Sequence, residues 1–181
     1  MRLPGPIGTL TGGRAPANEV TPSRSTRRRS SLPVRDAMQA TPQHTHQILT
    51  KRPDRMAEIT ASLRVLPNVW LGTSVESADY LGRIDDLRNV DAAVRFISFE
   101  PLLGSVARAD LTGIQWAIVG GESGPRSRPM AEQWVAEIEA ACRKARTAFF
   151  FKQWGGVRKK STGRHYRGRT FDEMPRAVVM S

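Results

Sequence analysis

The sequence predicts an α/β fold in which five mostly parallel strands alternate with helices. Short runs rich in β-branched and aromatic residues recur between residues 46 and 152. Segments whose apolar residues recur every three or four positions separate several of these runs, as in amphipathic helices. Helical segments of roughly 10–15 residues between strands are typical of βαβ units, which pair their strands in parallel through right-handed crossovers.

Five segments have the composition of strands, because each is dominated by apolar, β-branched or aromatic residues. They cover residues 46–50, 69–75, 94–99, 115–119 and 148–152. We expect them to pair side by side in one sheet.

Three helices are expected between these strands. In the first, Met56, Ile59 and Leu63 recur at spacings that place them on one helical face, and Pro53 lies near the first turn. The other two helices have longer apolar stripes. These are Tyr80, Leu81, Ile84 and Leu87 in the second helix and Trp134, Val135, Ile138, Ala141 and Cys142 in the third.

The number of strands limits the architecture. A chain of 181 residues normally forms one domain. A closed eight-stranded βα barrel usually takes about 250 residues, and five strands are too few to close one. The sequence therefore predicts either a small open sheet or an incomplete TIM-like barrel.

The net charge of +11 is concentrated at the two ends of the chain. Residues 1–35 contain seven Arg and one Glu, and residues 152–181 contain eight Lys and Arg with two acidic residues, so each end carries +6. Residues 36–151 between them have a net charge of −1. The high isoelectric point therefore belongs to the ends and not to the expected α/β core.

The charge distribution suggests three parts of the chain. Residues 1–36 are rich in Arg, Ser, Pro and Gly without any hydrophobic period, and we expect them to be disordered. Residues 37–157 should form the α/β domain, and residues 158–181 a basic C-terminal tail. Such charged ends are usually only solvated, but nucleic-acid binding, or an organellar transit peptide at the N-terminal end, are alternatives.

The chain has one cysteine, Cys142, on the expected stripe of the third helix. One thiol excludes an internal disulfide framework and any zinc or iron–sulfur site built from several thiolates of this chain. No apolar run approaches the roughly 20 residues of a membrane span. These observations predict a protein of the cytoplasm that does not enter a membrane and holds no metal.

Charged and small residues directly follow each expected strand. Parallel sheets bind ligands beyond the carboxyl ends of their strands, so these residues are the candidate ligand-binding site. The candidates are Lys51, Arg52, Ser74, Glu76, Glu100, Gly120, Gly121, Glu122, Ser123, Lys152 and Gln153.

A single Glu at a strand end is usually solvated or caps the next helix. Three consecutive strands followed by Glu76, Glu100 and Glu122 are harder to explain by capping, and favour a shared polar site. We expect Lys51 and Lys152 to lie close enough to compensate the carboxylates. The pair at 120–121 would let the backbone approach a ligand, although two glycines are more often just a turn.

Several of these runs together resemble an uncharacterised family of bacterial and bacteriophage proteins, a domain of unknown function often described simply as a phage protein. The resemblance extends from about residue 37 to residue 175. Its motifs occur in order at residues 41–56, 70–76, 95–104, 116–125, 150–155 and 168–175.

The resemblance implies an activity and cofactors that residues 1–36 do not support. Family members begin with a three-cysteine motif similar to that of radical S-adenosylmethionine enzymes, on the first part of a barrel, which implies an iron–sulfur cluster and S-adenosylmethionine. Residues 1–36 contain no cysteine. We therefore expect a truncated member, resembling the C-terminal part of the family and inactive by itself.

Two functions are compatible with this resemblance. In the first, the intact family is enzymatic, and Gly120, Gly121 and Glu122 resemble the Gly-Gly-Glu element that holds the amino group of S-adenosylmethionine, although this element follows a late strand. In the second, the chain is a non-catalytic α/β binding module whose basic ends contact nucleic acid.

Overall fold

The computed structural model describes residues 32–157 and 163–175. The chain divides into residues 1–35 and residues 36–181, and the elements below belong to the second unit except where α1 crosses the boundary. Most of the segment 1–36 that we expected to be disordered lies outside the described residues. Its end does not, because α1 (Leu32–Ala40) is a helix that the composition did not predict.

The five predicted strands are confirmed and form one parallel sheet. They are β1 (His46–Thr50), β2 (Val69–Ser74), β3 (Val94–Phe99), β4 (Trp116–Gly120) and β5 (Ala148–Gln153). They lie in the sheet in chain order, and each pairs in parallel with the next. The α/β class and the strand count follow the sequence prediction.

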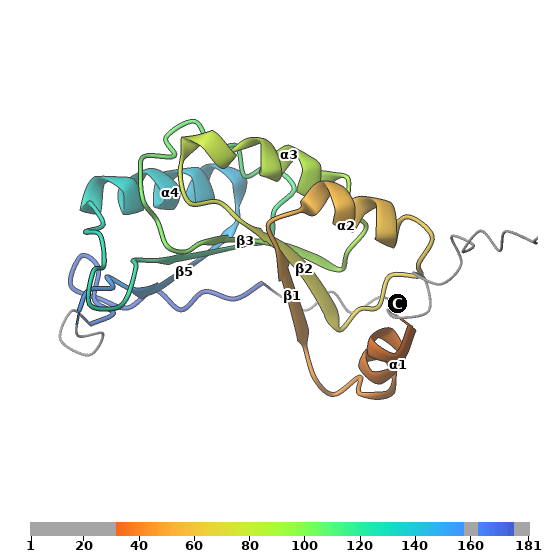
Figure 1. Cartoon of the computed structure of the whole chain (residues 1–181). Helices are drawn as coiled ribbons and strands as arrows, with labels where there is room; N and C mark the ends of the chain where they lie inside the picture. The colour runs from red at the N-terminus through yellow and green to blue at the C-terminus, as the bar shows by residue number, and fades with distance from the viewer. Residues whose placement is uncertain (1–31, 158–162, 176–181) are drawn as a thin grey trace, which may run out of the picture. The chain divides into compact units, whose positions relative to one another are not determined.

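The helices of the domain lie on one side of this sheet. Figure 1 shows α2 (Pro53–Thr60), α3 (Gly82–Arg88) and α4 (Glu132–Ala145) above the same face. The main core fills the space between them, and it includes Ile84, Leu87, Val135, Ile138 and Cys142 from the helices with every second residue of the central strands. This one-sided packing leaves the opposite face of the sheet without a helical cover.

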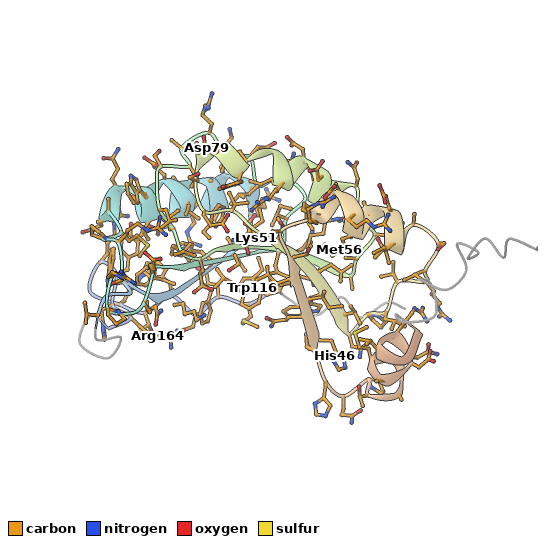
Figure 2. The ribbon with its side chains drawn as sticks, in the orientation of Figure 1. His46, Lys51, Met56, Asp79, Trp116 and Arg164 are labelled. Atoms are coloured by element: carbon orange, nitrogen blue, oxygen red, sulfur yellow. The ribbon has the colours of Figure 1, made fainter. Side chains whose placement is uncertain are left out.

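A smaller aromatic cluster occupies that opposite face. Its members are Trp70, Val94, Phe96 and Trp116, with Ile118, Ala148 and Phe150 packed against them. Trp116 contacts Trp70 and Phe150 edge-on, with ring centroids 5.8 and 5.9 Å apart. Figure 2 shows Trp116 on the side of the sheet away from α3 and α4.

Two of the predicted helices are shorter than their periodicity suggested. Helix α2 ends at Thr60, whose hydroxyl donates to the Met56 carbonyl, so only Met56 of the expected stripe is buried while Ile59 and Leu63 are exposed. Tyr80 lies in a separate 3₁₀ turn, η2 (Ala78–Tyr80), and is exposed. Local hydroxyl bonding to the backbone competes with helix propagation, and apolar spacing alone does not register it.

The described part of the expected C-terminal tail is folded onto the sheet. Residues 171–173 run antiparallel along the outer edge of β5, where Phe151 N–H donates to the Phe171 carbonyl at 2.9 Å. Glu173 returns to β4, because its carbonyl accepts from the Trp116 indole at 2.9 Å. Residues 163–175 are therefore part of the domain.

No helix among the described residues is long and apolar enough to span a membrane.

Candidate functional site

The carboxyl ends of β2 and β3 carry two serines and two glutamates in matching positions. Ser74 and Ser98 are directly opposite each other in the parallel register. Glu76 and Glu100 each follow two residues after the serine of their own strand. Because the side chains of a strand alternate between its faces, a spacing of two keeps each glutamate on the same face as its serine.

Glu76 is a buried carboxylate held by two cations. Its side chain is 6% exposed, and its Oε1 lies 2.6 Å from the Lys51 ammonium. Arg83 reaches Oε2 at 3.0 Å and also donates to the Ser74 carbonyl at 2.9 Å. A buried carboxylate is tolerated only when it is paired, and Oε1 still has no aligned hydrogen-bond donor.

Glu100 lies over β4 and is held from the far side of the sheet. The Lys152 ammonium, at the end of β5, is 3.1 Å from its Oε1. The Ser98 hydroxyl donates to Oε2 at 3.2 Å. Lys152 can cross β4 to reach Glu100 because the intervening residue is Gly120, where an added Cβ would be 2.4 Å from Oε1.

These residues form one charged rim, which we define as Lys51, Glu76, Arg83, Glu100 and Lys152. The two lysines come from the two edges of the five-stranded sheet and pair with glutamates on its inner strands. Figure 2 shows Lys51 at one end of β1, with His46 at the other. The rim has three positive and two negative groups, so it favours an anionic group by one charge.

Small residues separate the charged rim from the aromatic cluster. Ser74 and Ser98 end their strands on the open face, and Gly120 ends β4 without a side chain. Below them on the same strands lie the rings of Trp70, Phe96 and Trp116. A layer of hydroxyls and glycine between a charged rim and an apolar floor is a typical lining of a ligand site.

Glu122, the third predicted carboxylate, is bound within its own loop. Its Oε2 accepts from the Arg128 backbone N–H at 2.9 Å and from Arg128 Nε at 2.8 Å, and its Oε1 accepts from Nη2 at 3.0 Å. Arg52 behaves in a similar way, since it pairs with Asp54. Neither residue contacts the charged rim through the bonds it makes.

The glycines at 120–121 have a structural reason that the sequence did not indicate. The Gly121 N–H donates to the Gln153 carbonyl at 3.0 Å, and a Cβ on Gly121 would be 1.9 Å from the Trp154 carbonyl oxygen. The amide of Gln153 donates to the Ser123 hydroxyl at 2.8 Å. These residues join the ends of β4 and β5, and the Gly121 amide is not available to a ligand.

Arg83 belongs to the charged rim but was missed in the sequence. It lies in the first turn of α3, directly after Gly82, and its guanidinium stacks 4.1 Å from the Tyr80 ring centroid. The helix that follows β2 must begin near the carboxyl end of that strand. A basic residue in its first turn was the available signal.

Hydrogen bonds from Arg128, first from its side chain and then from its backbone, lower the pKa of Glu122 from 4.5 to about 2. Since the folded pKa lies below the unfolded value, the Glu122–Arg128 pair stabilises the fold above pH 4.5, and this stabilisation disappears as the pH falls towards 2. We expect an NMR titration of the Glu122 carboxyl carbon to have its midpoint near 2, and to move towards 4.5 in Arg128→Gln. Arg126→Gln is the control and should leave the midpoint unchanged. A wild-type midpoint at the ordinary value would contradict the pairing.

The position of the chain among known proteins is decided by one match. Residues 26–175 match DUF5131, a family of proteins of unknown function. The chain belongs to the DUF5131 family. No match was found among curated proteins or among solved structures. The DUF5131 match covers the sheet, every residue of the charged rim and the folded C-terminal segment.

The residues of this DUF5131 chain do not fit an iron–sulfur cluster. Such clusters are held by several thiolates. Cys142 is the one cysteine of the sequence and is fully buried on α4, where desolvation raises the pKa of its thiol to about 12. Within residues 32–157 and 163–175, no group of three or more His, Cys, Asp or Glu side chains could hold a metal ion.

Proposed function

We propose that the charged rim binds the amino-acid end of a small ligand, and that this ligand is S-adenosylmethionine, which the radical-enzyme resemblance implies. The DUF5131 chain then acts as a ligand-binding α/β domain. The observation that carries the proposal is the convergence of lysines from both edges of the sheet on two glutamates of its inner strands.

The exposure of the four side chains supports this role. The side chains of Lys51 and Lys152 are 66% and 54% exposed, whereas those of Glu76 and Glu100 are 6% and 20% exposed. The lysines are therefore the accessible partners and the glutamates the fixed ones. An incoming group can draw a lysine outwards at little cost, because exposed ion pairs contribute only about 0–1 kcal/mol.

Charge balance favours a ligand that has both an ammonium and a carboxylate. A ligand anion that withdraws Lys152 leaves Glu100 with only the Ser98 hydroxyl. A ligand ammonium in the same molecule restores the missing charge, so no buried carboxylate loses its compensation. An α-amino-acid group satisfies both requirements, and the methionyl end of S-adenosylmethionine is such a group.

The arrangement of the sheet supports a site on this face. A sequential order of parallel strands, with all crossover helices on one side, is the order found in βα barrels. In a barrel, the face without helices is the interior, and ligands bind at the carboxyl ends of its strands. The charged rim and the aromatic cluster correspond to these two regions in the partial barrel that we propose.

Isothermal titration calorimetry of the full chain with S-adenosylmethionine, with methionine and with adenosine tests the proposal. We expect Glu100→Gln to weaken the binding of S-adenosylmethionine and of methionine about tenfold or more, since it removes a charge-assisted hydrogen bond to the ammonium. Glu122→Gln is the matched control, because Glu122 follows the next strand but is bound to Arg128. It should leave both dissociation constants unchanged.

Three outcomes would contradict the proposal. The first is wild-type protein that binds neither S-adenosylmethionine nor methionine. The second is a loss of binding in Glu122→Gln with none in Glu100→Gln, which would place the ligand on the Gly120–Glu122 element. The third is adenosine binding that falls as strongly as methionine binding in Glu100→Gln.

A further inference from the structure

We propose that the turn at residues 164–169 binds the phosphate backbone of nucleic acid. We define this basic turn by its three arginines, Arg164, Arg167 and Arg169. It lies beyond β5 and contains no residue of the charged rim. Figure 2 shows Arg164 near β5, on the side of the sheet away from α4. The inference is independent of any ligand at the charged rim.

The backbone of the basic turn is a tight, defined structure. Tyr166 and Arg169 exchange two backbone hydrogen bonds, at 2.9 and 3.2 Å. Arg167 and Gly168, the two residues between them, have φ angles of 49° and 77°. Two consecutive positive φ values are those of a type I′ turn, the usual connection of a two-residue hairpin. The turn therefore presents Arg167 and Arg169 at fixed positions.

One buried aromatic residue anchors the turn to the domain. Tyr166 is 1% exposed and packs with Phe149, Phe151 and Phe171, with ring centroids 5.4–6.4 Å away. The Trp154 indole also donates to the His165 carbonyl at 2.8 Å. A basic segment that is merely solvated needs no such anchor. Here the buried ring holds exposed arginines on a rigid support.

Each arginine of the basic turn rests on an aromatic ring. The guanidinium carbons of Arg164, Arg167 and Arg169 lie 5.2, 5.1 and 4.3 Å from the ring centroids of Phe150, Tyr166 and Phe171. All three arginines are exposed. Stacking fixes the plane of a guanidinium while leaving its N–H groups open, and this lowers the entropy cost of binding a phosphate with two hydrogen bonds.

The carboxylates near the basic turn do not block it. Arg164 pairs with Asp172 and Arg167 with Glu139, and both arginines keep about half of their side-chain surface exposed. Exposed pairs of this kind are weak, and a phosphate can replace the carboxylate. Arg169 has no ion pair with a carboxylate of the described residues. Residues 158–171 contain no Asp or Glu.

The chemistry of the turn favours nucleic acid over other anionic partners. A membrane-binding hairpin exposes large apolar side chains, but the one large apolar side chain of this turn, Tyr166, is buried. Planar, stacked arginines match phosphate, and the spacing of several arginines along one short turn suits a polymer with repeated charges. The net charge of +11 adds a long-range attraction to polyanions.

The test is fluorescence anisotropy of a labelled DNA duplex and of a labelled single-stranded RNA, each titrated with the full chain at several salt concentrations. We expect Arg167→Gln/Arg169→Gln to weaken binding about tenfold at moderate salt. On duplex DNA, the slope of log K against log salt should become shallower by about 0.9 for each phosphate that the variant no longer neutralises. Arg55→Gln/Lys144→Gln removes the same charge from exposed positions on α2 and α4 and should change neither quantity.

A third variant separates charge from geometry. Arg169→Lys keeps the charge but loses the planar fork, so it should preserve the salt slope while weakening binding several-fold. Circular dichroism melting confirms that each variant is folded. Equal losses in the two double variants would overturn the proposal, as would unchanged binding in Arg167→Gln/Arg169→Gln. Tighter binding to polyglutamate or to phosphatidylserine vesicles than to either nucleic acid would also overturn it.

Discussion

Tyr166→Ala is expected to lower the free energy of unfolding by about 3–5 kcal/mol, the usual cost of deleting a buried aromatic ring. The ring is 1% exposed and contacts four other aromatic side chains around β5. For a chain of this size, such a loss lowers the melting temperature by about 10 °C. Urea unfolding followed by circular dichroism measures it.

Tyr80→Ala is the matched control for this prediction, because the Tyr80 side chain is 42% exposed. It loses mainly its stacking with Arg83 and should cost about 1 kcal/mol or less. Tyr166→Phe keeps the buried ring and should remain close to the wild type. If Tyr166→Ala were no more destabilising than Tyr80→Ala, residues 163–175 would not be an integral part of the domain.

Gly121→Ala is expected to destabilise the domain by about 3 kcal/mol, at the upper end of what overpacking usually costs. The added Cβ would be 1.9 Å from the Trp154 carbonyl oxygen. That carbonyl belongs to backbone, and the Gly121 N–H bond to Gln153 fixes the same segment. The ends of β4 and β5 must therefore separate to admit one methyl group, which urea unfolding would detect.

Gly120→Ala provides the comparison at the neighbouring position. Its added Cβ would be 2.4 Å from Glu100 Oε1, the far end of a flexible side chain that can move away. We expect a loss of about 1 kcal/mol or less, together with a broken Glu100–Lys152 pair. Equal destabilisation by the two variants would show that Gly121 has no special role.

The strands were predictable from the sequence because their signal is local. Buried parallel strands are short apolar runs, and the run at 94–99 contains all of β3. Parallel pairing then places every strand end at the same edge of the sheet. The positions of Lys51, Glu76, Glu100 and Lys152 at that edge therefore followed from the chain itself.

The partners within that edge were decided by tertiary structure. Glu76, Glu100 and Glu122 look equivalent in the sequence, but each takes a different cation. Arg83 reaches Glu76 because α3 packs behind β2, and Arg128 binds Glu122 because its loop folds back. Ion pairing depends on loop paths and on side chains brought together from distant positions, and neither leaves a periodic signal.

The two ends of the domain show the same division. Composition correctly marked residues 158–181 as basic, but it could not show that the described part, residues 163–175, folds along β5. That docking depends on Tyr166 and Phe171 finding an aromatic pocket beside Phe149, a contact between residues that are not neighbours in the chain. By itself, the sequence determined the strands and their charged edge, because burial and alternation are local properties. Only the tertiary structure decided which charges pair and which segments dock, because those outcomes depend on non-local packing.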